Sequence, residues 1–347
     1  MADTPANGRH PTLADIARAS GVAISTASRA LSTPGRVSPE TVERVQAVAR
    51  DLGYLPPREV RARAPRASRT IAVLVSDVTN PFYFGIIRGT QHQLKAAGYT
   101  QLLVDTEESE ELEENMLRTL RTSCDGVILT ASRLQDDTLA ELADSMPLVV
   151  INRDNPRIPN VLIDTPNGML QALAHLRSHG HRSVVYAAGP PTSWIGEERW
   201  RALKAGGEHY GIDVRRVGPF MPRRESGAAA ADEVLNSGAS ACIAFNDLLA
   251  IGMLQRFGER GVRVPEDLSV VGCDDIFGAD FCHPALTTLT APIEQAGQVA
   301  VSMLLGGIDS RVSSGLRRTA TLPTHLTVRA SSGPAPGSRP STADGSA

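Results

Sequence analysis

Residues 12–32, with the sequence TLADIARASGVAISTASRALS, constrain the fold of this chain more than any other stretch. Their apolar residues recur at helical spacing on both sides of Ser20-Gly21-Val22, which predicts two short helices joined by a tight turn. Glycine suits the sharp bend, and the valine after it can fill the space behind the turn. The pattern leaves one polar face of the second helix turned outward: Ile24, Ser25, Ser28 and Arg29.

Such a pair of helices is either an ordinary helical hairpin or a helix-turn-helix, whose second helix enters the major groove of DNA. A third predicted helix favours the helix-turn-helix. It begins at Ser38-Pro39-Glu40, turns Val42, Val45 and Ala49 inward, and ends at Gly53. Three helices packed into so few residues predict a small DNA-binding domain over residues 11–57, after a disordered N-terminus at residues 1–10.

The charge distribution agrees with this interpretation. Residues 1–69 contain 11 arginines and no lysine against 6 acidic residues, whereas the whole chain of 347 residues has a net charge of −3. Basic side chains therefore collect at the end that holds the three helices, where DNA phosphates would lie. The remainder of the chain is acidic, so it is not expected to bind nucleic acid.

Composition excludes several other classes of protein. The four cysteines have no spacing typical of zinc ligands, and we read them as buried apolar residues. No apolar run approaches the roughly 20 residues that span a bilayer, and the first ten residues lack the apolar core of a signal peptide. We therefore expect a cytoplasmic protein with no membrane segment, no metal and no cofactor.

From Thr70 onward, short apolar strands alternate with helices, which is typical of parallel sheets. The strands are expected at residues 71–75, 102–104, 126–129, 148–151, 183–187, 242–245, 269–272 and about 319–327. Two comparable series of this kind predict two similar α/β lobes over residues 70–331. Residues 58–69 are rich in Pro, Ala and Arg, as linkers are, and residues 332–347 have the low complexity of a disordered tail.

Polar residues follow four of the predicted strands at the end where parallel sheets bind ligands. They are Asn80, Arg153, Asn246 and Asp274, and an aromatic residue, Phe82, lies close to the first of them. Each one alone is explained better by a structural role: a turn or a helix cap for the Asn and Asp residues, and a surface position for Arg153. Together they predict a cleft whose amides, carboxylate, guanidinium and aromatic face suit a polyhydroxylated ligand.

Ordered motifs in the first 60 residues resemble one protein family. T-L-x-D-I-A-R-x-S-G-V, S-x-A-S-R-A-L, V-S-P-E-T-x-x-R-V and L-G-Y-x-P look like the headpiece of the lactose-repressor family of bacterial transcription regulators. One position departs from the pattern, because Ala23 stands where the family usually has a serine that caps the second helix. Residues 70–330 resemble the periplasmic sugar-binding fold that this family shares, with Asn80-Pro-Phe-Tyr83, His179-Gly-His-Arg182 and Phe245-Asn-Asp247 as signposts.

The resemblance implies a small all-α helix-turn-helix headpiece followed by an α/β two-lobed periplasmic-binding-protein-like domain. It also implies a homodimer that binds a near-palindromic, double-stranded operator and is controlled by a small molecule, expected to be a carbohydrate. Ile24, Ser25 and Arg29 are expected to meet base edges, whereas phosphates would be bound by Thr26, Ser28 and Arg36. The effector residues implied by the resemblance are Asn80, Phe82, Arg153, Trp194, Arg199, Asn246 and Asp274.

The family's linker is a hinge in which a leucine wedges open the minor groove. Arg63 occupies that position here, so we expect Arg61 and Arg63 to enter a narrow minor groove; a basic tether that contacts only phosphates is the alternative. Motifs of nucleotide-dependent enzymes, serine hydrolases and zinc proteases are missing from the sequence. The alternatives to a repressor are a cytoplasmic sugar-processing enzyme and an effector-independent DNA-binding protein. Whether the effector releases or promotes DNA binding stays open.

Overall fold

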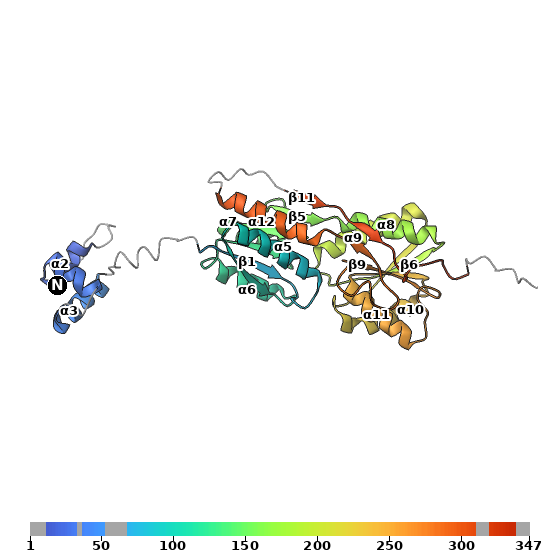
Figure 1. Cartoon of the computed structure of the whole chain (residues 1–347), viewed down its shortest axis with the longest axis horizontal. Helices are drawn as coiled ribbons and strands as arrows, with labels where there is room; N and C mark the ends of the chain where they lie inside the picture. The colour runs from blue at the N-terminus through green and yellow to red at the C-terminus, as the bar shows by residue number, and fades with distance from the viewer. Residues whose placement is uncertain (1–11, 33–36, 53–67, 310–318, 338–347) are drawn as a thin grey trace, which may run out of the picture. The chain divides into compact units, whose positions relative to one another are not determined.

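The computed structural model describes residues 12–32, 37–52, 68–309 and 319–337, and the chain divides into two compact units, Met1–Ser68 and Arg69–Ala347 (Figure 1). The described part of the first unit consists of three helices: α1 Leu13–Ser20, α2 Ile24–Ser32 and α3 Pro39–Asp51. All strands within the described ranges belong to the second unit.

The three helices pack around a core of small and branched side chains. The core consists of Ile16, Ala17, Ala27, Ala30, Val45 and Ala49. α1 begins at Thr12, whose backbone N–H and hydroxyl donate to the Asp15 carboxylate at 2.9 and 2.6 Å. It ends at Gly21, whose φ of 65° lies in the left-handed region that favours glycine. The predicted helix-turn-helix and third helix are therefore confirmed.

The second unit contains two lobes, each built on a six-stranded sheet. In lobe 1 the strand order is β11-β5-β4-β3-β1-β2, and all of the described pairings are parallel. The strands are β1 Thr70–Val75, β2 Thr100–Asp105, β3 Gly126–Thr130, β4 Leu148–Ile151, β5 Asn160–Ile163 and β11 Thr319–Leu322. The helices are α5 Phe82–Ala96, α6 Glu110–Leu120, α7 Asp136–Ser145 and α12 Ile293–Asp309.

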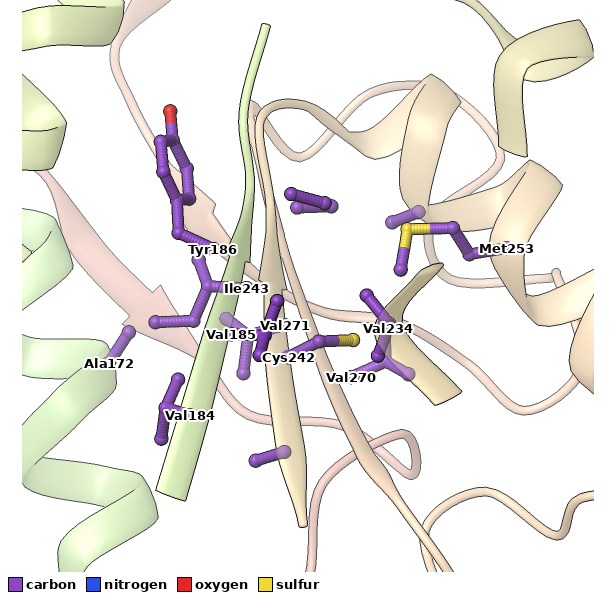
Figure 2. Close-up of a cluster of buried hydrophobic side chains, with 14 of the residues drawn as sticks. Ala172, Val184, Val185, Tyr186, Val234, Cys242, Ile243, Met253, Val270 and Val271 are labelled. Carbon is purple, nitrogen blue, oxygen red and sulfur yellow. The ribbon is translucent and has the colours of Figure 1, made fainter. Parts of the chain in front are cut away.

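Lobe 2 repeats the arrangement with strand order β12-β10-β9-β8-β6-β7, in which β12 runs antiparallel to β10. The strands are β6 Ser183–Ala187, β7 Asp213–Val217, β8 Ala241–Ala244, β9 Ser269–Cys273, β10 Thr287–Thr290 and β12 His325–Thr327. The helices are α8 Thr165–Ser178, α9 Trp194–Tyr210, α10 Gly227–Ser237, α11 Asp247–Glu259 and the short 3-10 helix η2 Arg224–Ser226. Figure 2 shows strand residues such as Val184 and Val270 packed between helices on the two faces of this sheet.

Five strands of each sheet share one topology, because β5-β4-β3-β1-β2 corresponds to β10-β9-β8-β6-β7. In both sheets the order reverses beside the first strand, β1 or β6, and ligands bind at such switch points beyond the carboxyl ends of the strands. Within the described residues the chain passes from one lobe to the other after β5, after β10 and after β11. These three crossings join the lobes into one unit.

The predicted fold class is confirmed, with corrections in detail. The sequence interpretation missed β5, β7, β10 and α10, and its single strand near residues 319–327 is two strands that belong to different sheets. The expectation of disorder from residue 332 onward is wrong for residues 332–337, where Ser332 and Ala335 are buried. The reason is a set of backbone and hydroxyl hydrogen bonds to lobe 2, which composition does not reveal.

Candidate ligand cleft and nucleic-acid interface

A cleft lies between the two lobes at the carboxyl ends of both sheets and encloses about 400 Å³ of empty space that opens to solvent. Of the seven predicted ligand residues, five line it: Asn80, Phe82, Arg199, Asn246 and Asp274. The lining also contains residues that the sequence interpretation did not select, among them Tyr83, Glu108, Arg133, Asn152 and Phe245. Residues from both lobes therefore face one another across a single cavity.

Two predicted residues do not line this cavity. Arg153 turns away from it, because its guanidinium donates to the Leu134 carbonyl at 3.0 Å and to the Asp136 carboxylate at 2.8 Å. Trp194 begins α9 and is half-buried outside the lining. The neighbours of these two residues, Asn152 and Ile195, occupy the cleft instead.

A buried ion pair forms part of the lobe 1 wall. The Arg133 guanidinium donates to the Glu108 carboxylate, from Nε at 2.8 Å and also from Nη2, and both side chains are buried. Glu113 on α6 fixes the turn behind this pair by accepting from the Ser132 hydroxyl and from the Arg133 backbone N–H at 3.1 Å. Burial raises the pKa of the Glu113 carboxyl above its ordinary value.

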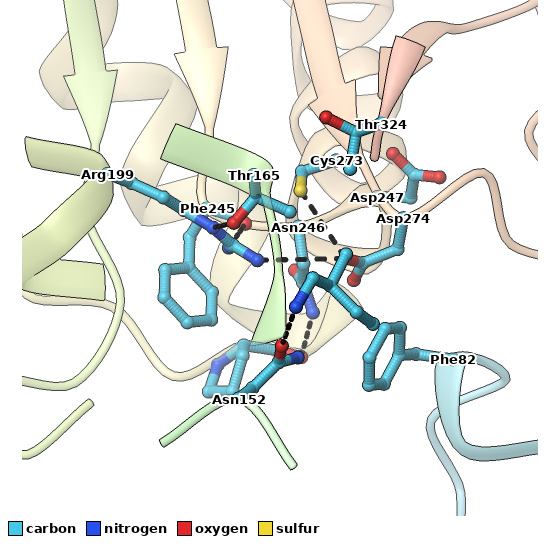
Figure 3. A network of polar contacts seen from close by, with 12 residues as sticks. Phe82, Asn152, Thr165, Arg199, Phe245, Asn246, Asp247, Cys273, Asp274 and Thr324 are labelled. Carbon is cyan, nitrogen blue, oxygen red and sulfur yellow. Dashed lines mark hydrogen bonds and ion pairs between the residues drawn. The ribbon is translucent and has the colours of Figure 1, made fainter. Parts of the chain in front are cut away.

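In lobe 2, Arg199 of α9 holds the floor of the cleft together (Figure 3). Its guanidinium donates to the Thr165 hydroxyl and to the Phe245 carbonyl, both at 2.9 Å, and lies 3.9 Å from the Asp274 carboxylate. Thr165 begins α8, directly after the chain crosses from lobe 1. The same guanidinium thus joins three segments of lobe 2 next to an interlobe crossing.

Of the carboxylates that line the cleft, Asp274 has the weaker hydrogen-bond and charge partners. It is 8% exposed, and among the described residues its carboxylate accepts the Cys273 thiol at 3.4 Å and lies 3.9 Å from the Arg199 guanidinium. Burial raises its pKa to about 7, against the opposing effect of Arg199. Nearby, burial raises the pKa of Asp247 to about 6, although Asp247 accepts the Thr288 hydroxyl at 2.5 Å and the Ile276 N–H at 2.9 Å.

Several residues that line this cavity have a strained backbone conformation. Glu108, Ala131, Asn152 and Asp274 all line it and all have positive φ, between 47° and 120°. Non-glycine residues adopt this conformation at a cost in free energy, and such residues cluster at functional sites. Strained positions beyond four different strands therefore support a binding role for the cleft.

Three amides in the cleft are fixed by local hydrogen bonds. The Asn80 side-chain carbonyl accepts the Phe82 N–H at 3.0 Å, that of Asn152 accepts the Ile163 N–H at 3.1 Å, and Asn246 caps α11. The Asn246 amide group also donates to the Pro222 carbonyl at 2.9 Å. Within the described structure the amide NH₂ groups of Asn80 and Asn152 donate to no protein acceptor, so they are available to a ligand.

The outward face of α2 is exposed as the sequence pattern predicts. Ile24 is 55% exposed, Ser25 and Arg29 are exposed, and Thr26 and Ser28 are half-buried. The Ala23 carbonyl accepts the N–H groups of Thr26 and Ala27, which places Ala23 at the helix start. The predicted DNA contacts Arg36, Arg61 and Arg63 lie outside the described residues.

Two other kinds of feature are missing from the described residues. No helix there is both long and apolar enough to cross a membrane. No group of three or more His, Cys, Asp or Glu side chains in the same ranges is arranged to hold a metal ion.

Comparisons with known proteins agree with both parts of the chain. Residues 12–57 match the sequence profile of bacterial regulatory proteins of the lacI family, and residues 173–332 match that of a periplasmic binding protein-like domain. The HTH-type transcriptional repressor CytR of Escherichia coli (strain K12) is 32% identical over 88% of this chain and 92% of its own length. The HTH-type transcriptional regulator CelR of Thermobifida fusca is 32% identical, covering 93% of this chain and 98% of its own.

Solved structures show the same fold. A transcriptional regulator CelR–cellobiose complex superimposes with a TM-score of 0.69 at 30% identity, covering 92% of this chain and 99% of that one. A LacI family regulator from Enterococcus faecalis with bound ribose has a TM-score of 0.69 at 27% identity over 76% of this chain and 99% of its own. The chain therefore belongs to the lacI family of bacterial regulatory proteins and is a DNA-binding transcription regulator of the helix-turn-helix type.

Proposed function

We propose that this regulator is a repressor whose affinity for its operator is controlled by a neutral sugar bound between the two lobes. The observation that carries the proposal is the cleft itself, which combines two arginine–carboxylate pairs, two available amide NH₂ groups and the aromatic residues Phe82 and Phe245. Paired charges and amides hydrogen-bond hydroxyl groups, and aromatic faces pack against the apolar faces of sugar rings. The cellobiose and ribose complexes of the two relatives support this ligand class.

The DNA-binding part of the proposal assigns roles to the exposed face of α2. Arg29 pairs with a guanine, Ile24 contacts a thymine methyl group, and Ser25 meets either kind of partner. Thr26, Ser28 and Arg36 hold phosphates, which position the helix, while Arg61 and Arg63 enter the minor groove. Two chains form a homodimer on a near-palindromic operator, because the two-fold symmetry of a dimer is mirrored in its site.

The cleft position explains how a ligand controls DNA binding. Because residues of both lobes line the same cavity, a ligand there stabilises one relative arrangement of the lobes over others. Operator affinity changes only to the extent that the ligand prefers one arrangement. The protein thus acts on DNA in the cytoplasm as a sensor, and it binds the sugar without converting it, which a turnover assay with the bound sugar would check.

A thermal-shift screen tests the ligand class. Purified protein is heated with monosaccharides, disaccharides, purines and sugar phosphates, and the screen is repeated with Asp274→Ala. A ligand at 100 times its dissociation constant adds about 2.7 kcal/mol to the stability of the folded state. A sugar that raises the melting temperature of the wild type but not of the variant, and alters operator binding in a gel-shift assay, supports the proposal. Stabilisation by a purine or a phosphate alone would overturn the sugar assignment.

A further inference from the structure

The ring of Phe245 is fixed on the floor of the ligand cleft. The residue follows β8 directly, is 7% exposed and lines the cavity. Its ring packs on bare backbone: a Cβ atom on Gly189 would lie 2.4 Å from the ring, and one on Gly196 would lie 3.2 Å from it. Only glycine at position 189 leaves room for the ring in this place.

Arg199 holds Phe245 from the other side. The guanidinium carbon lies 5.3 Å from the ring centroid, and the same guanidinium donates to the Phe245 carbonyl at 2.9 Å. Figure 3 shows the arginine side chain over the phenylalanine, between Thr165 and Asp274. A cation against an aromatic face adds to the stability of this stack, more so when both are withdrawn from water. Contacts with Gly189, Gly196 and Arg199 therefore hold the ring in its place at the cavity.

We infer that Phe245 is a specificity-determining residue that limits the effector to a single sugar ring. This inference rests on the proposed sugar-binding function and narrows it. The cavity is small, because its empty space of about 400 Å³ includes the part that is open to solvent. A rigid aromatic ring at the floor fills the space into which a second sugar unit would extend.

The opposite wall completes the site for one ring. Phe82 presents a second aromatic side chain from lobe 1, and Figure 3 shows it on the other side of the polar network from Phe245. Arg133 pairs with Glu108 on one wall and Arg199 faces Asp274 on the other, so each guanidinium already has a carboxylate partner. Two aromatic side chains and balanced charges select a neutral ring with hydroxyl groups on its edge.

Calorimetric titration with matched sugars tests the inference. The probes are D-glucose, D-galactose, D-xylose and D-ribose, together with the disaccharides cellobiose, maltose and lactose. The wild type is expected to bind one monosaccharide at least tenfold more tightly than any disaccharide. Phe245→Ala should reduce or reverse this preference, because it opens the floor, and Phe245→Leu should shift it in the same direction by a smaller factor.

Phe84→Ala is the matched control, since Phe84 is exposed on α5 outside the cavity, and it should leave the preference unchanged. Tighter binding of a disaccharide than of any monosaccharide by the wild type would overturn the role of Phe245 while leaving the proposed sugar effector intact. If the folded Phe245 variants kept the wild-type preference for a monosaccharide, the role of Phe245 would likewise be overturned. If no sugar binds the wild type although it still binds DNA, the proposed effector class itself fails, and the inference fails with it.

Discussion

Ionising the carboxyl group of Asp274 in the folded state has a cost in free energy, because the group is buried and lies 3.9 Å from the nearest guanidinium. Burial raises its pKa from an ordinary value of 3.8 to about 7. The native state therefore binds a proton more tightly than the unfolded state does, so folding stability falls as the pH rises from about 4 to about 7. A ligand that donates hydrogen bonds to the ionised carboxylate would offset this cost.

Asp274→Asn should stabilise the ligand-free protein above pH 7. Each pKa unit corresponds to about 1.4 kcal/mol, so the free energy of unfolding should rise by up to roughly 4 kcal/mol at pH 8. The difference from wild type should shrink steadily as the pH falls towards 4, because the carboxyl group is then protonated in the native state and increasingly so in the unfolded state. Calorimetric unfolding from pH 4 to pH 8 measures this, with Asp280→Asn at an exposed position as the control. A difference that is the same at every pH would contradict the prediction.

Arg29 is exposed on the outward face of α2, next to the buried Ala27 and Ala30 that anchor the helix. Arg29→Ala should weaken operator binding by about 1–3 kcal/mol and relax sequence preference at one base pair per half-site, as expected for a lost bidentate contact to guanine. Binding-site selection from a randomised operator pool measures both effects. Arg50→Ala, at an exposed position in the last turn of α3, should leave the sequence preference unchanged. Equal weakening on all sequences would make Arg29 a phosphate contact instead.

At the scale of elements, apolar runs predicted most of the strands that are buried on both faces. β1, β3, β6, β8 and β9 all coincide with such runs. β7 was missed because its sequence, DVRRV, belongs to an edge strand with one exposed and one half-buried arginine. α10 was missed because its alanine-rich first half has little apolar periodicity. Patterns of this kind do not reveal element boundaries that are set by packing between segments distant in sequence.

The candidate cleft was predictable in part. Asn152, Phe245 and Asp274 each follow a strand directly and line the cavity. The second residue after a strand behaves differently from case to case, because Asn246 lines the cavity whereas Arg153 turns away to contact Leu134 and Asp136. Its direction depends on the loop that follows the strand, which the sequence pattern does not reveal. Glu108 and Arg133 were missed because they lie three positions beyond their strands, in turns held by contacts with distant residues: the Glu108 N–H donates to the Ser76 carbonyl, and the Arg133 N–H donates to the Glu113 carboxylate.

The segment after β12 shows how a chain of low complexity becomes part of a core. Ser331 donates to the Val270 carbonyl at 2.7 Å and accepts the Thr287 N–H at 2.8 Å. His181, fully buried before β6, lies 3.0 Å from the Gly333 carbonyl and 3.1 Å from the Ser269 hydroxyl. Small serine and glycine residues fit between these partners, so hydrogen bonding rather than apolar burial orders the segment.

Acid should loosen this C-terminal segment. Burial lowers the pKa of His181 and of His175, and the neighbouring His179 lowers both further. Neutral histidines therefore stabilise the fold at pH above about 6.5, and this stability is lost as the pH falls below that value. His181→Gln should reduce the free energy of unfolding at pH 7.5 by about 1–3 kcal/mol, because it disturbs buried hydrogen bonds. The variant should also lose less of its free energy of unfolding than the wild type does when the pH falls from 7.5 to 5.5.

Urea unfolding at the two pH values measures these changes. His92→Gln serves as the control, since His92 is exposed on α5, and it should leave the pH dependence as it is in the wild type. A His181→Gln variant that loses as much stability on acidification as the wild type would show that other groups cause the acid sensitivity.

At the scale of the whole molecule, the crossings between the lobes limit which rearrangement of the lobes a ligand can cause. The lobes share one strand topology and are joined after β5, β10 and β11, and connections of this kind between two lobes are where hinge motions occur. The residues that line the cleft lie beyond the carboxyl ends of both sheets. A small molecule bound there, as we propose, would act on the arrangement of both lobes at once.

The proposed dimer requires an interface, and lobe 2 has an exposed aromatic patch that could form it. Phe277 and Phe281, in the loop after β9, are 80% and 65% exposed, and their ring centroids lie 5.0 Å apart. Two adjacent exposed aromatic rings are unusual on a monomer and mark interaction sites. Because a symmetric dimer brings the same patch of both subunits together, these rings would pack against their counterparts on a second copy of the chain.

Replacing both Phe277 and Phe281 with serine should convert the dimer to a monomer, measured by sedimentation velocity. Operator affinity should fall at least a hundredfold, because a monomer binds one half-site and loses the gain of two linked headpieces. The sugar-induced rise in melting temperature should persist, since neither phenylalanine lines the cleft. Phe84→Ser removes an exposed aromatic residue from lobe 1 as a comparison. A double variant that stays dimeric would locate the interface elsewhere, whereas a monomer with undiminished operator affinity would show that one headpiece is sufficient for binding.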